Sequence, residues 1–192
     1  EIESYVSAEE YPSVRSELET IIEETKSKIS AATKNSEIGT ALREGKAAID
    51  EKTAPLLEEC RTEAKAEIDA YLQDNSGKFT EDEELTLYIE GVKAAIDECR
   101  APSVIKAKVS EAKAEVDRRI AQKELAEAKT AATAEVDAYA GEHAGAYADD
   151  ADFTALMAEA KAAINSAEDT ASVEGAKTAA IAKIDEFVAS KA

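Results

Sequence analysis

The sequence predicts an all-α protein made of tandem three-helix bundles, arranged as a rod in which the last helix of one module continues into the first helix of the next. Three observations lead to this prediction. The 192 residues are dominated by alanine, glutamate and lysine, with only 7 glycines and 3 prolines, which is typical of helices. Apolar residues recur at steps of three and four, and several motifs recur with a period of about 67 residues.

The repeat is defined by three short motifs that keep the same period. The first motif, Glu-Ile/Val-acid-x-Tyr, begins at Glu1, Glu67 and Glu135, so its copies are 66 and 68 residues apart. The second motif comprises Lys46–Asp50, Lys113–Asp117 and Ala182–Asp185, and the third comprises Lys28–Ser30, Ala95–Asp97 and Ala163–Asn165. Separate motifs that share one period indicate that the whole segment between them is repeated.

Each copy is predicted to contain three helical segments, named A, B and C. Such segments carry apolar or small residues on one face, as amphipathic helices do. In segment B these residues are Leu18, Ile21, Thr25, Ile29 and Ala32, then Leu85, Tyr88, Val92, Ile96 and Cys99, then Phe153, Leu156, Ala160, Ile164 and Ala167. In segment C they are Ile38, Leu42, Gly45 and Ile49, then Ile105, Val109, Ala112 and Val116. In segment A they are Leu57, Cys60, Ala64, Ile68 and Tyr71, then Leu125, Ala128, Ala132, Val136 and Tyr139.

The start of each segment B is marked by an aromatic residue followed by a polar or acidic entry. The aromatic residues are Tyr11, Phe79 and Tyr147, and the entries are Ser13, Thr80–Glu84 and Asp149–Asp152. We expect the ring to pack on the first turn and the acids to cap its free amides. Tyr5, Tyr71 and Tyr139 end segment A at equivalent positions, which predicts a packing role.

Segments C and A are predicted to join across the boundaries between copies. From Val104 to His143 the chain has no proline and only one glycine, Gly141, so we predict one helix of roughly 38 residues, or ~57 Å. At the first boundary Pro55 either restarts the helix or kinks it. The predicted modules are residues 1–52, which lack most of segment A and form mainly a B–C hairpin, then residues 53–120 and residues 121–192.

The charge of the chain restricts its partners. A net charge of −19 opposes binding to nucleic acid and to anionic membranes, which both require a cationic surface. It favours a monomer that does not self-associate. No segment approaches the ~18 apolar residues that membrane insertion requires. Because the chain begins inside a repeated motif, we expect it to be an excerpt of a longer protein.

No motif predicts an enzyme, a cofactor or a metal site. His143, the only histidine, lies between two glycines without a partner ligand nearby. The run Asp149–Asp152 lacks the glycine and the closing glutamate of a calcium loop, so capping explains it better. Acids and lysines alternate along helical faces, as solvated pairs do, and no nucleophile or phosphate-binding motif is present. We therefore predict a protein that is not an enzyme and has no cofactor.

The two cysteines leave two interpretations open. Cys60 and Cys99 occupy stripe positions where the other copies have alanine, which favours a pair of small buried residues. The alternative is a disulfide between segments A and B. Counting across the intervening turn places the two residues roughly 7 Å apart along the helix axis, an awkward offset for the ~5.5 Å Cα separation of a disulfide.

The segment from Ala163 to Lys177 resembles the turn between helices 2 and 3 of albumin-binding GA modules. More broadly, the Ala-Lys-x-x-Ile-Asp pattern is similar to three-helix repeats of Gram-positive surface proteins, including the FIVAR-type and DUF1542-type families. The resemblance covers the B–C hairpin of each copy.

The resemblance implies a secreted or cell-surface protein of the bacterial cell wall. Its modules would bind a host protein, immunoglobulin or serum albumin, through the exposed faces of segments B and C and without a cofactor. The alternative is a spacer that presents another domain and has no ligand of its own. The shared helix favours the spacer, whereas Tyr88 and the cysteines, present only in copy two, favour a binding module.

Overall fold

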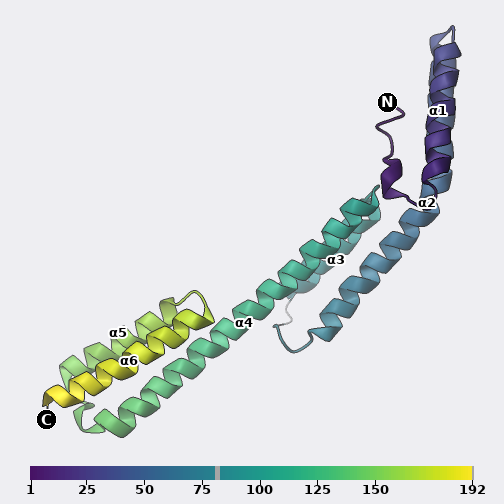
Figure 1. Cartoon of the computed structure of the whole chain (residues 1–192). Helices are drawn as coiled ribbons and strands as arrows, with labels where there is room; N and C mark the ends of the chain where they lie inside the picture. Colours follow the sequence, from purple (N-terminus) through teal and green to yellow (C-terminus); the bar gives the residue numbers. More distant parts are fainter. Residues whose placement is uncertain (81–82, 192) are drawn as a thin grey trace. The chain divides into compact units, whose positions relative to one another are not determined.

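A computed structural model describes residues 1–80 and 83–191 of the chain. In these residues the regular structure is helical and contains no strand, which confirms the all-α prediction (Figure 1). A 3₁₀ helix, η1 (Ala8–Glu10), precedes α1 (Arg15–Ala31), α2 (Asn35–Asp74) and α3 (Glu83–Glu98). Then follow α4 (Pro102–Ala144), a second 3₁₀ helix η2 (Gly145–Tyr147), α5 (Ala151–Ser166) and α6 (Thr170–Lys191). None of the helices in the described part is long and apolar enough to cross a membrane.

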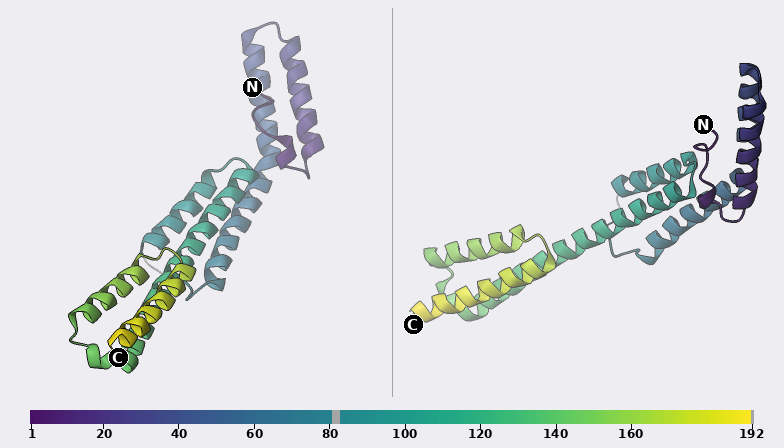
Figure 2. Two further views of the ribbon diagram at one scale, coloured as in Figure 1. Left: turned by 60° about the vertical axis from the view of Figure 1, so that its left-hand side comes forward. Right: turned by 45° about the horizontal axis from the view of Figure 1, so that its top comes forward.

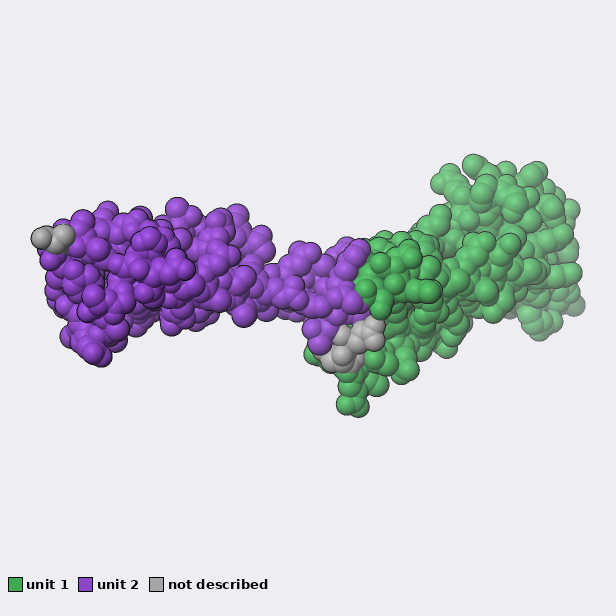
Figure 3. Space-filling view, turned by 90° about the horizontal axis from the view of Figure 1, so that it is seen from below, with its two compact units in different colours: residues 1–76, 81–116 green, residues 77–80, 117–192 purple. Residues whose placement is uncertain are grey.

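The contacts divide the chain into two compact units (Figure 3). Unit 1 comprises residues 1–76 and 81–116, and unit 2 comprises residues 77–80 and 117–192. Unit 1 therefore contains the first copy and most of the second, while unit 2 contains the third. The three predicted modules remain a prediction from the repeat.

Copy one is a hairpin of α1 and the first part of α2, closed by the N-terminal residues (Figure 2). Its core is small and consists of Ile2, Tyr11, Leu18 and Ile49, each at most 3% exposed. Residues 1–5 form a turn, in which the Tyr5 amide donates to the Ile2 carbonyl oxygen. This turn stands where segment A ends in the other copies. Ser13 does not cap α1, because the N-cap position belongs to Val14.

Helices α1 and α2 approach closely at Gly45. A Cβ atom added to Gly45 would lie 2.4 Å from Oγ1 and 2.7 Å from Cγ2 of Thr25. Thr25 is buried, and its hydroxyl donates to the Ile21 carbonyl oxygen at 2.7 Å. The equivalent pairs in the other copies are Val92 with Ala112 and Ala160 with Ala180. Copy one is thus the copy with glycine at the segment C position, opposite a threonine on segment B.

Helix α2 continues through Pro55 and does not restart there. Pro55 is residue 21 of the 40 in the helix, and the helix changes direction near its middle (Figures 1 and 2). Proline has no N–H to donate to the Glu51 carbonyl group, and both residues are exposed, so water can solvate that group. On the buried side, the Thr53 hydroxyl donates to the Ile49 carbonyl oxygen at 3.0 Å. Of the two predicted effects of Pro55, the kink is observed and the restart is not.

In copy two, α3 lies beside the second part of α2 and the first part of α4 (Figures 1 and 2). The buried face of α3 consists of Leu85, Ile89, Val92 and Ile96. The assignment of Tyr88 to the core was wrong, since Tyr88 is 40% exposed and Ile89 is 5% exposed. Positions 88 and 89 both satisfy helical spacing from Leu85 and Val92, and the aliphatic side chain takes the interior.

Unit 2 is a bundle of the second part of α4 with α5 and α6. Its core contains small and aliphatic residues with one buried aromatic ring: Ala132, Val136, Ala140, Ala144, Phe153, Ala160, Ile164, Val173, Ala180 and Ile184. Tyr147 packs edge-on against Phe187, with the ring centroids 5.6 Å apart. This contact is with the C-terminal part of α6, whereas the ring was expected to pack on the first turn of segment B.

Helix α4 is continuous over 43 residues. This confirms the prediction that segment C of copy two and segment A of copy three form one helix. At 1.5 Å per residue it is about 65 Å long.

The contact between Gly45 and Thr25 gives a first prediction. We expect Gly45→Ala to destabilise copy one by about 1–2 kcal/mol, because overpacking of ~1–3 kcal/mol exceeds the ~1 kcal/mol gain in helix propensity. Adding Thr25→Ala, which reproduces the alanine pair of copy three, should restore the loss. The measurement is amide hydrogen exchange of α1 in the full chain.

The matched control is Gly39→Ala in the same helix, where an added Cβ meets no atom within 4 Å. This substitution should stabilise α2 by about 1 kcal/mol. Equal effects of the two glycine substitutions would contradict the close approach.

Candidate functional site: the repeated helix ties

The residues of the Glu-Ile/Val-acid-x-Tyr motif contact the other two segments of their own copy. The aliphatic residue of the motif, Ile2, Ile68 or Val136, is at most 3% exposed in each copy. Beside it, the first Glu of the motif pairs with a lysine of segment C in every copy. The pairs are Glu1 with Lys46 at 2.7 Å, Glu67 with Lys113 at 2.5 Å and Glu135 with Lys177 at 2.8 Å.

The acid at the third motif position pairs with segment B. Glu3 lies 2.8 Å from the Lys26 Nζ atom, Asp69 pairs with Lys93, and Asp137 lies 2.8 Å from the Lys161 Nζ atom. The three lysines occupy equivalent positions of the repeat. We call the pairs made by the first and third motif residues, together with the tyrosine contact below, the helix ties.

The tyrosine that ends the motif reaches the aspartate that ends the second motif. The Tyr5 hydroxyl is 3.0 Å from both carboxylate oxygens of Asp50, and the Tyr139 hydroxyl donates to Asp185 Oδ1 at 2.7 Å. The ammonium groups of Lys46 and Lys113 lie 5.1 Å from the ring centroids of Tyr5 and Tyr71. In copy three His143 stacks on Tyr139 instead, with the ring centroids 4.1 Å apart.

The helix ties fix the register of three segments around a thin core. The acids of these pairs are exposed and the lysines are partly exposed, and ion pairs near the surface contribute little free energy individually because water screens them. Their electrostatic effect is nevertheless visible, since the hydrogen bond from Lys46 lowers the pKa of Glu1 and the hydrogen bond from Lys26 lowers the pKa of Glu3. The sequence showed the motif as a repeat, but only the structure identifies the partner of each residue.

The acid run before α5 is a helix cap. Asp150 Oδ1 accepts hydrogen bonds from the Asp152 amide at 2.9 Å and the Phe153 amide at 3.3 Å, and Asp150 Oδ2 lies 2.9 Å from the Lys191 Nζ atom. The hydrogen bond from Lys191, followed by that from the Phe153 amide, lowers the pKa of Asp150. In the counterpart of copy two, Glu81 and Asp82 lie outside the described residues.

Both cysteines are free thiols in this structure. Cys99 is 8% exposed, and its Sγ atom lies 3.2 Å from the Ala95 carbonyl oxygen. Arg61, the neighbour of Cys60, donates from Nη2 to the Cys99 carbonyl oxygen at 2.7 Å. The arrangement matches the interpretation of Cys99 as a small buried residue, and the disulfide to Cys60 is not formed.

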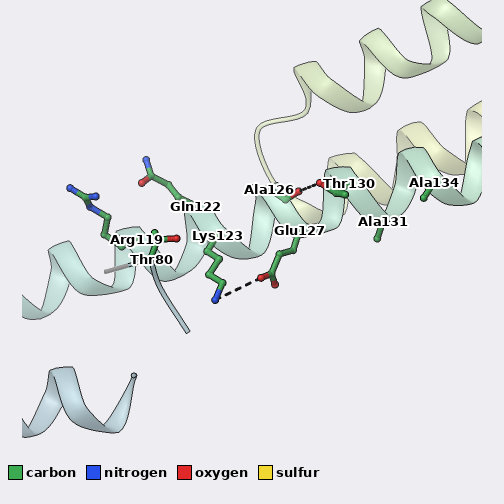
Figure 4. Close-up of a pocket in the computed structure, with 9 residues that line it drawn as sticks. All are labelled: Thr80, Arg119, Gln122, Lys123, Ala126, Glu127, Thr130, Ala131 and Ala134. Carbon is green, nitrogen blue, oxygen red and sulfur yellow. Dashed lines mark hydrogen bonds and ion pairs between the residues drawn. The ribbon is translucent and has the colours of Figure 1, made fainter. Parts of the chain in front are cut away.

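A shallow hollow of about 590 Å³ lies along α4 in unit 2 (Figure 4). It is lined by Thr80, Arg119, Gln122, Lys123, Ala126, Glu127, Thr130, Ala131 and Ala134. Lys123 donates to the Gly77 carbonyl oxygen at 2.6 Å and faces Glu127 at 3.8 Å. Almost all of the lining comes from one helix, so polar groups do not converge on a common point, as they do in binding pockets.

Copy two exposes three large apolar side chains. Leu87 is 60% exposed, Tyr88 is 40% exposed and Val104, near the start of α4, is 47% exposed. The other copies have Thr20 and Ala155 in place of Leu87, and Glu37 and Ser172 in place of Val104. We call these three residues together the copy-two apolar face; Leu87 and Tyr88 lie near the start of α3 and Val104 near the start of α4, on the segments that were expected to carry a binding surface.

No cluster of three or more histidine, cysteine, aspartate or glutamate residues that could hold a metal ion occurs in the described part of the chain. Comparison with known proteins assigns neither a family nor a function to the chain. No family model matches the chain, and neither a curated protein nor a solved structure matches it.

The bond between Tyr139 and Asp185 predicts an unusual titration. The hydrogen bond to the Asp185 carboxylate raises the pKa of Tyr139 above its ordinary value. Ultraviolet titration of tyrosine absorbance should therefore show Tyr139, identified with Tyr139→Phe, ionising at lower pH in Asp185→Ala. Glu186→Ala, on the neighbouring residue of α6, is the control. Identical curves for Asp185→Ala and the parent chain would contradict the tie.

The cap at Asp150 predicts acid sensitivity in unit 2. Because the folded state lowers the pKa of Asp150, its stabilisation is complete above about pH 4, the ordinary range of aspartate. It is lost as the pH falls through the lower folded value. Asp150→Ala should therefore lower the melting temperature of unit 2 at pH 7, and the difference from the parent should be smaller at about pH 3, below the ordinary pKa of aspartate. Asp149→Asn should match the parent at both pH values in circular dichroism melts.

Proposed function

We propose that this chain is a non-enzymatic spacer, a rod of tandem three-helix bundles that presents another domain of a bacterial surface protein. The observation that carries the proposal is the continuity of helices across the repeat boundaries. Helix α2 spans residues 35–74 and α4 spans residues 102–144, so each contains segment C of one copy and segment A of the next. A shared helix couples neighbouring copies without a flexible linker.

The use of the repeated polar residues also supports a spacer. The charged and hydroxyl groups of the Glu-Ile/Val-acid-x-Tyr motif serve the helix ties, so the feature common to all copies is intramolecular. The exposed surface is strongly acidic, with a net charge of −19. Such a surface favours solubility and opposes self-association, as suits repeats held at high local density.

Small-angle X-ray scattering of the full chain tests the spacer. A compact protein of 192 residues has a radius of gyration of about 16 Å. We expect a value roughly one and a half times larger with the cross-section of a single three-helix bundle, because α2 and α4, ~60 and ~65 Å long, overlap only in copy two. A value near that of a compact protein would refute the rod.

Binding of a host protein is the second candidate, and the copy-two apolar face favours it. Leu87, Tyr88 and Val104 differ from their counterparts in the other copies and are exposed. Exposed aromatic and aliphatic side chains are typical anchors of protein interfaces. The partner class follows from the resemblance to surface repeats, which implies immunoglobulin or serum albumin.

A pull-down from human plasma with the immobilised chain separates the two candidates. Under the spacer proposal we expect no saturable partner. Under the binding proposal, immunoglobulin or albumin is captured, and Leu87→Thr, Tyr88→Ala and Val104→Ser together reduce capture by at least tenfold, since two or three anchors carry most of an interface energy. Thr20→Ala and Ser172→Ala, at equivalent positions in the other copies, are the matched control.

A further inference from the structure

The junction between copies one and two contains a contact made by polar residues that the sequence does not repeat at the second boundary. The segment Ser7–Tyr11, which includes η1, lies against the turn between α3 and α4. Glu10 Oε2 accepts a hydrogen bond from the Ser103 amide at 3.1 Å, and the Tyr11 hydroxyl donates to the Arg100 carbonyl oxygen at 3.2 Å. We call residues 7–11 the junction strap. All of these residues belong to unit 1.

Helix α4 depends on the strap for a cap. In copy one, Glu37 of the B–C turn accepts from the amides of Thr33 at 2.8 Å and Lys34 at 3.2 Å. In copy three, Asp169 accepts from the Ser172 amide at 2.6 Å. The turn of copy two, Arg100-Ala101-Pro102-Ser103, has no acid. Glu10, 93 residues away in sequence, supplies the missing carboxylate to the second residue of α4.

The strap and Arg61 connect the α3–α4 turn to the parts of the chain on either side of Pro55. On one side, Tyr11 is 3% exposed and belongs to the core of copy one with Leu18 and Ile49. On the other side, Arg61, which follows Pro55 in α2, donates to the Cys99 carbonyl oxygen of the same turn at 2.7 Å. The turn is thus tied to copy one before the proline and to α2 after it.

Apolar packing does not fill this junction. A hollow of about 410 Å³ lies between the N-terminal segment, α2 and the α3–α4 turn, and its lining includes Tyr5, Tyr11, Thr53, Leu57 and Arg100. The proline interrupts the hydrogen bonds of α2, and the hollow removes apolar packing beside that helix. The polar contacts of the strap are therefore needed to restrain the angle of the kink.

At the second boundary the sequence has neither the proline nor the polar residues of the strap. The equivalent stretch of α4, residues 118–124, contains no proline, and Lys78 and Phe79 stand at the positions of Glu10 and Tyr11. Lysine cannot accept from an amide, and phenylalanine has no hydroxyl group. The polar groups of the strap therefore occur only beside the interrupted helix.

We propose that the junction strap is a conformational latch that holds the kink of α2 at Pro55 at one fixed angle. With the strap in place, copies one and two move as one body. Without it, α2 bends freely at the residue where its hydrogen-bond ladder is interrupted. The latch goes beyond the spacer proposal and holds whether or not the chain presents another domain.

Distance measurement by electron paramagnetic resonance tests the latch. Spin labels are placed at the exposed positions Ser30 in α1 and Ser110 in α4, in the full chain carrying Cys60→Ala and Cys99→Ala. We expect the parent to show a dominant narrow distance distribution with a minor broad component. Glu10→Ala and Tyr11→Phe should each increase the population of a second, broader distribution about fivefold, as expected for one lost hydrogen bond.

Two further variants complete the test. Glu9→Ala, in the same segment but with a side chain that reaches only Arg15 at 3.9 Å, should leave the distribution narrow. Pro55→Ala added to Glu10→Ala and Tyr11→Phe should restore a narrow distribution, because an uninterrupted helix needs no latch. Tyr11→Phe keeps the buried ring, so copy one stays folded, which hydrogen exchange of α1 verifies.

The latch is refuted if Glu10→Ala and Tyr11→Phe leave the distribution narrow. It is also refuted if the broad distribution persists after Pro55→Ala, because the strap would then restrain something other than the kink. The spacer proposal fails separately, through a compact scattering profile of the parent chain.

Discussion

The meeting of one aliphatic side chain from each of three segments is the contact on which every copy depends. In copy one Ile2, Leu18 and Ile49 share one core, and in copy three Val136, Ile164 and Ile184 share another. The copy-two counterparts of these copy-three residues, Ile68, Ile96 and Val116, are at most 1% exposed, whereas in copy one the counterpart of Ile164 is the partly buried Ile29. In copy three, five of the seven other core residues are alanine, so few other large side chains are available to hold those helices together.

A core of few large side chains leaves the register of the helices to be specified by contacts outside it. Small residues allow the helices to approach closely, but they specify the register of one helix against another only weakly. The helix ties supply that register from the rim, through pairs such as Glu1 with Lys46 and Glu3 with Lys26. Even copy one, whose segment A is reduced to a turn, keeps these pairs. The buried core therefore supplies most of the folding free energy of a copy, and the helix ties at its surface determine the register of its helices.

Much of the fold could be read from the sequence, because helical periodicity and a repeat are local signals. The continuity of α4 followed from the absence of proline, and the cap at Asp150 followed from a cluster of acids at a helix start. Tyr88 was misplaced because two adjacent positions satisfied the same spacing, and only packing decides between them. The restart at Pro55 was left open because the cost of proline depends on whether the freed carbonyl group meets water.

The candidate site was less accessible from the sequence. The motif Glu-Ile/Val-acid-x-Tyr was visible, but its partners lie 23 to 46 residues away, as for Lys26 with Glu3 and Tyr139 with Asp185. The contact of Glu10 with Ser103 joins residues 93 positions apart, and copy two has Lys78 in place of Glu10, so no repeat pattern could reveal it. Contacts that break the symmetry of a repeat require the folded chain.

The uninterrupted ladder of α4 also restricts how such an array can change length. Each residue added to or removed from an α-helix turns everything beyond it by about 100° and shifts it by 1.5 Å along the axis. A single-residue insertion in the middle of α4 would therefore rotate the azimuth of copy three without disturbing either core. Insertions of seven residues, close to two full turns, would preserve that azimuth, so changes of length in such a helix are restricted to whole turns.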